Sequence, residues 1–134
     1  MTEKIGEQPV RSERIGDVAV VYVGDYLNKL SGERVERECR RQLEEGCRAL
    51  VIDFRHTGMV NSIGVSILLG VIDAAEQSNA PLVFSCVKSQ AAQIFDLLGL
   101  TRHVKLASDK RDALELINHP APVRAAANYK AVGE

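Results

Sequence analysis

Apolar and polar residues alternate in blocks along this chain, and each block has the length of one strand or one helix. Nearly continuous apolar runs at 48–54 and 81–87 are typical of strands that are covered on both faces. Between them, residues 63–78 repeat apolar side chains at helical spacing and predict a helix. Its wide apolar face consists of Ile67, Leu68, Val71, Ile72 and Ala75.

The N-terminal part of the pattern predicts a hairpin and then a surface helix. Two extended runs, 11–15 and 17–23, are separated by a single glycine, as in a short hairpin. Residues 31–46 follow, with a candidate N-terminal cap at Ser31 and a terminating glycine at Gly46. The apolar stripe of this helix is narrow and consists of Val35, Cys39 and Leu43.

The C-terminal part adds two helices and one strand. Residues 89–98 predict a helix that starts at Ser89 and ends before Gly99. A short strand is expected at 103–107 and a last helix at 108–117. Two acidic residues lie near the start of that helix, where negative charge is favoured: Asp109 and Asp112.

The resulting order, β-β-α-β-α-β-α-β-α, places the chain in the α/β class. Strand–helix–strand units of this length pair their strands in parallel with right-handed crossovers, and the hairpin adds an antiparallel edge. We expect one domain over 11–118, with a mixed, mostly parallel sheet of four or five strands and about four helices. Residues 1–10 would be an extension, and 119–134 either a flexible tail or a short docking helix.

Length and composition fit one ordinary globular domain and argue against nucleic-acid binding. The chain has 134 residues, of which 46% are hydrophobic and 26% charged. Its 17 basic and 18 acidic residues give a net charge of −1, without the basic excess of a phosphate-binding surface. Tryptophan is absent and other aromatic residues are few, so a base-stacking platform is not expected.

No segment predicts export, membrane insertion or a bound cofactor. The first ten residues lack the apolar core of a signal peptide, and no apolar run reaches the length of a membrane span. The three cysteines and three histidines show neither a CxxC pair nor the spacing of metal ligands. We therefore expect no metal, no cofactor, reduced thiols and a cytoplasmic location.

A small polar pair, Asn61 and Ser62, stands just before the aliphatic helix. Capping alone can explain it, because the first turn of a helix leaves backbone N–H groups that Asn or Ser can satisfy. A functional explanation competes, because loops at the carboxyl ends of parallel strands meet ligands and partners. A serine there would be exposed at a positive helix end, which tolerates a phosphate. No general base lies close in sequence, so Ser62 is a weak candidate nucleophile.

Four segments of the chain resemble the STAS domain family, which includes the anti-sigma factor antagonists. The second of these segments contains the polar pair. The resemblance spans residues 11–118 through "VGDYLN", "LVIDFRHTGMVNSIGVSILL", "APLVFSCVKSQAAQIFDLLGLTRHV" and "SDKRDALELI". The central motif of the family is an acid or Asn, then Ser, a small residue, Gly and an aliphatic helix. It corresponds here to Asn61-Ser62-Ile63-Gly64-Val65.

The resemblance implies a regulatory binding module and not an enzyme. In such systems the dephosphorylated antagonist binds an anti-sigma factor that is also a serine kinase, and the sigma factor is released. The kinase can then phosphorylate the motif serine, which corresponds to Ser62. The resemblance also implies a partner-binding surface made of Asp25, Asn28, Asn61, Ile63 and Gly64.

The chain departs from the family pattern beside this serine. Asn28 and Asn61 are neutral where family members often carry a carboxylate, and Ile63 replaces a small polar residue. The two asparagines reflect either drift at surface loops or a less acidic rim with a changed partner choice or phosphorylation rate.

Two alternatives stay open on the sequence. One is a STAS subunit that docks on an ATPase of a transport system and is never phosphorylated. The other is a small enzyme that uses Ser62 or a cysteine. Neighbouring genes would separate the first from a phosphorylation switch, and labelling of Ser62 by an acyl-serine probe would favour the second.

Overall fold

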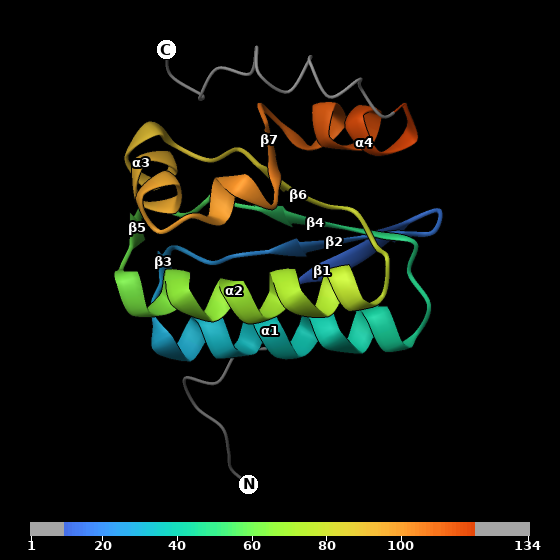
Figure 1. Cartoon of the computed structure of the whole chain (residues 1–134), viewed down its shortest axis with the longest axis horizontal. Helices are drawn as coiled ribbons and strands as arrows, with labels where there is room; N and C mark the ends of the chain where they lie inside the picture. Colours follow the sequence, from blue (N-terminus) through green and yellow to red (C-terminus); the bar gives the residue numbers. More distant parts are fainter. Residues whose placement is uncertain (1–9, 120–134) are drawn as a thin grey trace, which may run out of the picture.

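A five-stranded sheet with helices on both faces forms the described part of the chain, residues 10–119 of a computed structural model (Figure 1). The strands lie in the order β1-β2-β4-β6-β7. Only the pairing of β1 with β2 is antiparallel, so the expected mixed, mostly parallel sheet is confirmed. The strand bounds are Ser12–Ile15 (β1), Val18–Tyr22 (β2), Ala49–Asp53 (β4), Leu82–Ser85 (β6) and Lys105–Ala107 (β7).

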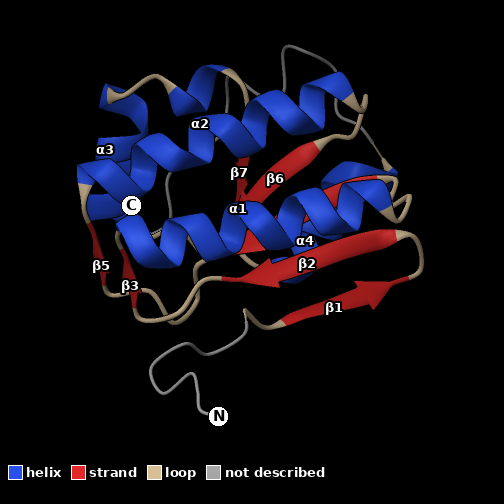
Figure 2. Ribbon diagram, turned by 90° about the horizontal axis from the view of Figure 1, so that it is seen from below, coloured by secondary structure: helices blue, strands red, loops and turns tan. Residues whose placement is uncertain are grey.

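The helices lie within two residues of the bounds that the sequence predicts. They are α1 (Lys29–Glu44), α2 (Ser62–Gln77), α3 (Ser89–Leu97) and α4 (Lys110–Asn118), with a 3-10 turn at Leu100–Arg102. The first two run side by side across one face of the sheet (Figure 2), and α4 covers the opposite face (Figure 1). No helix within residues 10–119 is both long and apolar enough to cross a bilayer.

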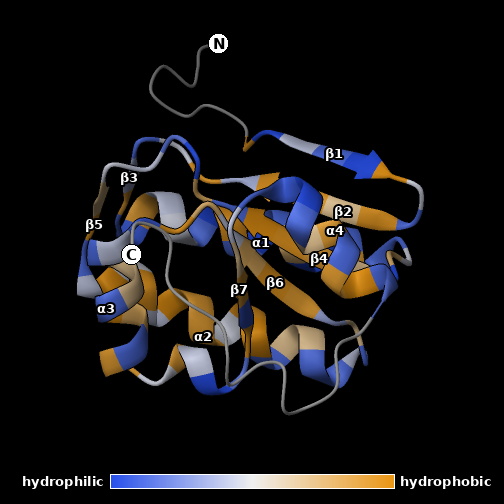
Figure 3. Cartoon of the chain, turned by 90° about the horizontal axis from the view of Figure 1, so that it is seen from above, coloured by the Kyte–Doolittle hydropathy of each residue, from blue (hydrophilic) through white to orange (hydrophobic). Residues whose placement is uncertain are grey.

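Alternating strand side chains form one core on each face of the sheet, so β2, β4 and β6 are strongly apolar along their length (Figure 3). On the face of α1 and α2, the rings of Phe54, Phe84 and Phe95 meet with centroids 5.2 to 5.4 Å apart. Leu68 of α2 is fully buried in the same core. The core under α4 includes Val20, Val51, Val83, Ala113 and Ile117.

The first helix begins earlier than the sequence analysis indicates. Its N-cap is Asn28, so the cap predicted at Ser31 is wrong. The Asn28 side-chain oxygen accepts the Ser31 N–H at 3.0 Å, and the Ser31 hydroxyl oxygen accepts the Asn28 N–H at 2.9 Å. This reciprocal capping box satisfies two N–H groups that would otherwise have no partner.

The structure also has a second, two-stranded sheet, which the sequence pattern does not predict. It pairs β3 (Tyr26–Leu27) in parallel with β5 (Met59–Val60). Two residues are too short for any periodicity to show, so only the folded chain reveals them. The two strands lead directly into α1 and α2 and hold the starts of these helices next to each other (Figure 1).

The starts of α1 and α2 approach each other at a glycine. A Cβ atom on Gly64 would lie 2.8 Å from the carbonyl oxygens of Leu27 and Asn28. On the other helix, a Cβ on Gly32 would lie 3.3 Å from the carbonyl oxygen of Gly64. A side chain at position 64 would therefore push α2 away from the turn between β3 and α1.

The extension expected at 1–10 and the tail expected at 119–134 lie outside the described residues, apart from Val10 and His119. Val10 is half-buried and packs against the core of the α1 and α2 face.

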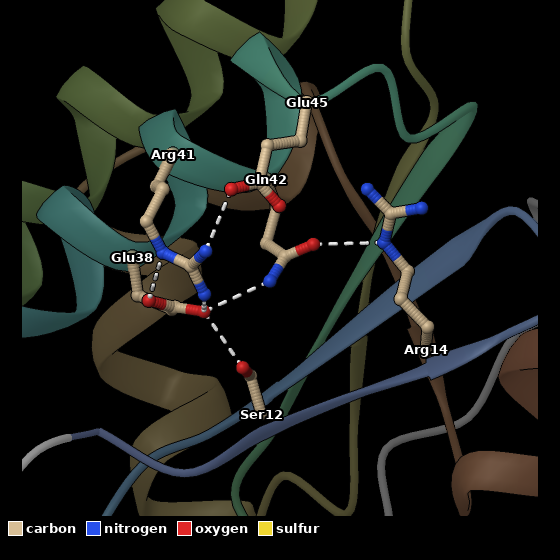
Figure 4. Close-up of polar contacts among 6 residues, drawn as sticks. All are labelled: Ser12, Arg14, Glu38, Arg41, Gln42 and Glu45. Carbon is tan, nitrogen blue, oxygen red and sulfur yellow. Dashed lines mark hydrogen bonds and ion pairs between the residues drawn. The ribbon is translucent and has the colours of Figure 1, made fainter.

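A polar network ties α1 to the edge strand β1 (Figure 4). The Glu38 carboxylate accepts hydrogen bonds from Ser12 Oγ at 2.6 Å, Arg41 Nη2 at 2.7 Å and Gln42 Nε2 at 2.9 Å. Arg14 extends the network by donating to the Gln42 side-chain oxygen at 2.8 Å. Burial by itself would raise the pKa of Glu38, but the hydrogen bonds and the charge of Arg41 outweigh it and lower the pKa to about 2.

Glu38 should therefore make folding stability depend on pH in acid. Its pKa falls from 4.5 to about 2 on folding, so its contribution is complete above the first value and is lost as the pH falls towards the second. We expect Glu38→Gln to lower the free energy of unfolding by about 1 to 3 kcal/mol at neutral pH. As the pH falls from 4.5 to about 2, the free energy of unfolding should drop less in the variant than in the wild type. Chemical denaturation across pH measures both effects. Glu44→Gln, at an exposed position of the same helix, controls for the lost charge, and parallel profiles for Glu38→Gln and wild type would contradict this role.

The close approach at Gly64 predicts an unusual cost for a small substitution. Gly64→Ala should lower the free energy of unfolding by about 1 to 3 kcal/mol, because the new methyl group meets backbone that cannot move away. Gly70→Ala in the same helix is the matched control. Its Cβ meets the flexible carboxylate end of Glu36 at 2.6 Å, and alanine there should be neutral or stabilise by up to about 1 kcal/mol. Equal melting temperatures for the two variants would argue against the contact.

Candidate functional site

Ser62 is the first residue of α2, and its side chain is exposed. The N-cap is its neighbour Asn61, whose side-chain oxygen accepts the Gly64 N–H at 2.9 Å. The Asn61 backbone N–H donates to the Leu27 carbonyl at 2.9 Å, which fixes the turn to β3. Within residues 10–119 the Ser62 hydroxyl has no hydrogen-bonding partner. Capping therefore accounts for Asn61 and leaves Ser62 available to other molecules.

Two similar turns lie side by side at this end of the molecule (Figure 1). The strand β3 leads through Asn28 into α1, and β5 leads through Asn61 into α2. Neither helix has an acidic residue in its first turn. An asparagine caps a helix about as well as an aspartate, but it brings no charge. The positive ends of both helix dipoles are therefore not neutralised by their own first turns.

The other predicted site residues lie in or beside these turns. Asp25 is exposed, and its carbonyl oxygen accepts the N–H groups of Gly58 and Met59 at 2.9 and 3.3 Å. Ile63 is 57% exposed directly beside Ser62. Gly64, in contrast, is buried against the chain's own backbone, so it can contribute to a partner surface only by setting the position of α2.

Two exposed apolar residues complete the surroundings and were not singled out from the sequence. Leu30 is 54% exposed in the first turn of α1, and Met59 is 60% exposed on β5. With Ile63 they form what we term the apolar rim: Leu30, Met59 and Ile63. Sequence alone does not separate these residues from core residues, because their exposure depends on which side of each short turn faces the sheet.

Within residues 10–119, neither Ser62 nor the cysteines have the surroundings of an activated nucleophile. No histidine or carboxylate of the described residues is hydrogen-bonded to Ser62, as an activated nucleophile would require. Burial raises the pKa of the thiols of Cys39, Cys47 and Cys86, which disfavours the reactive thiolate. The described part of the chain has no group of three or more His, Cys, Asp or Glu residues placed to hold a metal ion.

Several known proteins are similar to this chain in sequence or in fold. BtrV of Bordetella bronchiseptica, a proposed anti-sigma factor antagonist, is 22% identical over 101 residues, which cover 75% of this chain and 87% of BtrV. The solved structure of an RsbS variant from Moorella thermoacetica is similar with a TM-score of 0.73 at 21% identity, covering 83% of this chain and 96% of that chain.

The anti-sigma factor antagonist SpoIIAA is similar in two solved forms. The unphosphorylated form has a TM-score of 0.70 at 14% identity and covers 84% of this chain and 99% of its own. The phosphorylated Bacillus form has a TM-score of 0.64 at 15% identity and covers 79% of this chain and 96% of its own. These likenesses show the fold. The STAS domain model matches residues 9–113, most of the sequence, and the chain therefore belongs to the STAS domain family.

Proposed function

We propose that this chain is an anti-sigma factor antagonist in a phosphorylation switch. It binds an anti-sigma factor that is also a serine kinase, and phosphorylation of Ser62 ends that binding. The observation that carries the proposal is the exposed hydroxyl of Ser62, which takes no part in capping and starts α2 within a STAS domain. The similar protein SpoIIAA has been solved in unphosphorylated and phosphorylated forms, which supports the same chemistry here.

A phosphate at this position would act on the complex and not on the fold. It adds about −1.5 to −2 charges at pH 7 beside the positive end of α2, which favours negative charge. The domain should therefore stay folded. In a complex, the same dianion would have to leave water and enter a packed interface, where an unpaired charge is costly.

The switch predicts a single phosphorylation site. Incubated with its kinase, Mg²⁺ and ATP, the protein should gain one phosphate by intact mass, and Ser62→Ala should gain none. Because Asn61 supplies the cap, the free energy of unfolding of Ser62→Ala should lie within about 0.5 kcal/mol of the wild-type value. The variant should still bind the partner. Ser62→Asp should bind at least about tenfold more weakly, since a buried unpaired charge costs more than 1.4 kcal/mol.

Two outcomes would count against this assignment. Phosphate on another residue of Ser62→Ala would move the switch elsewhere. Equal affinity of wild type, Ser62→Asp and the phosphorylated protein would leave a docking module without a switch. Mass measurement of the protein from its own host adds a direct test of whether phosphate is present in cells.

The apolar rim predicts a separation of binding from stability. Ile63→Asp should weaken partner binding by about tenfold or more, because it places a charge where an apolar contact is proposed. Stability should be unchanged, since Ile63 is 57% exposed and the first turn of a helix tolerates an acid. Leu97→Asp at the end of α3, where the leucine is 83% exposed, is the matched control and should bind normally. Calorimetric titration and thermal unfolding measure the two properties, and a parallel loss of both would place Ile63 in the core.

A further inference from the structure

A hollow lies beside the turn that presents Ser62. Its volume is about 150 Å³, and it lies between the segment that leads to Ser62 and the first turns of α3. The apolar part of its lining consists of Met59, Val60, Ala91 and Ile94, and the polar part includes Thr57, Lys88 and Gln90. A closed apolar cavity of roughly this volume holds a molecule the size of benzene, whereas this hollow is open at the surface and partly polar. Met59 belongs both to this hollow and to the apolar rim.

The loop beside the hollow is held in place by a lysine. Lys88 Nζ donates to the carbonyl oxygens of Arg55 and Thr57 at 3.0 and 3.1 Å, and Thr57 Oγ1 donates to the Gly24 carbonyl at 2.7 Å. Carbonyl oxygens orient the lysine but do not cancel its charge. The hollow is therefore a preformed feature with a fixed cation at its edge.

Charge at this end of the molecule differs in sign from the chain as a whole. The helices α1, α2 and α3 all begin here (Figure 1), and none has an acidic residue in its first turn. In contrast, α4 has an aspartate both as its cap and in its first turn. In the segments 25–30, 55–63 and 88–91, three residues are positive and one is negative, with His56 neutral, whereas the whole chain carries −1. The positive residues are Lys29, Arg55 and Lys88, and the negative one is Asp25.

One neighbouring carboxylate, Glu33, reduces this excess from two positive charges to one. Glu33 lies 3.9 Å from Lys29 Nζ, and both side chains are largely exposed, so the pair is weak. The end of the molecule around Ser62 therefore combines an apolar rim, an open hollow and a positive potential. Potentials of opposite sign steer and select protein partners.

We propose that the partner docks here with an acidic segment, one apolar side chain of which enters the hollow between β5 and α3. This inference rests on the proposed function and extends its interface from the start of α2 onto α3. It also gives the phosphate a direct effect, since a phosphate on Ser62 would reverse the charge that attracts the acidic segment.

Two peptides test the proposal without the natural partner. One is a 12-residue peptide of leucine and glutamate with its leucines at helical spacing, and the other has lysine in place of every glutamate. Titrated into ¹⁵N-labelled full-length protein, the acidic peptide should shift the amide signals of 57–63 and 88–94. It should bind at least about tenfold more tightly than the basic one at low salt, and its affinity should fall as salt is added.

A pair of isosteric variants tests whether the acidic peptide binds at the hollow. Gln90 lines the hollow, and Gln93 is exposed on the same helix outside it. Gln90→Glu and Gln93→Glu change the net charge equally, but only Gln90→Glu should weaken binding of the acidic peptide, by about three- to tenfold. Thermal unfolding should show both variants folded, because an acid near the start of α3 is favourable or neutral.

Preference for the lysine peptide, absence of shifts with either peptide, or equal effects of the two variants would each overturn the proposal. These results are independent of any kinase. A Ser62 switch that works in a protein with no preference for acidic peptides would refute this docking mode alone. Failure of Ser62 to accept phosphate would instead refute the switch and leave the peptide result standing.

Discussion

The contact on which the site depends is the one between Gly64 and the backbone of Leu27 and Asn28. Because glycine has no Cβ, the start of α2 rests directly on the turn between β3 and α1. That contact places two capped helix starts side by side and leaves the first residues of each helix pointing outward. Ser62, Ile63 and Leu30 are exposed as a consequence, although each belongs to a helix whose following turns bury one face against the core.

Neutral caps give this surface its electrostatic character. Asn28 and Asn61 satisfy backbone N–H groups as aspartates would, so the helices lose no capping by the exchange. Compared with family members that carry carboxylates at these two positions, the chain has two fewer negative charges near Ser62. The surface is positive and apolar before phosphorylation and negative after it. This change in charge is clearer than it would be if carboxylates already surrounded the serine. Under the proposed function, this difference is the physical basis of the switch.

Two polar networks join the edge strand β1 to helices on the two faces of the sheet. On one side, Glu38 joins α1 to β1 through hydrogen bonds from Ser12, Arg41 and Gln42 (Figure 4). On the other, Lys110 at the start of α4 donates to Glu13 and to the Tyr22 hydroxyl, both at 3.0 Å, and so links residues 97 positions apart. Because neither these networks nor the two cores include Leu30, Met59 or Ile63, the apolar rim can change with little effect on folding.

Much of the architecture was determined by the sequence alone, because its strands and helices are long enough for their patterns to show. The buried runs became β4 and β6, the wide apolar face became the buried side of α2, and the motif placed Ser62 at the start of that helix.

Other features were decided only by the tertiary structure. The choice of Asn28 over Ser31 as a cap depended on a reciprocal hydrogen-bonded turn, and both residues are acceptable caps locally. The strands β3 and β5 exist because each provides the other's hydrogen bonds, and two residues carry no periodicity of their own. The exposure of Leu30 and Met59, and the hollow beside them, depend on how three helix starts meet in space, which is a long-range property that no local pattern contains.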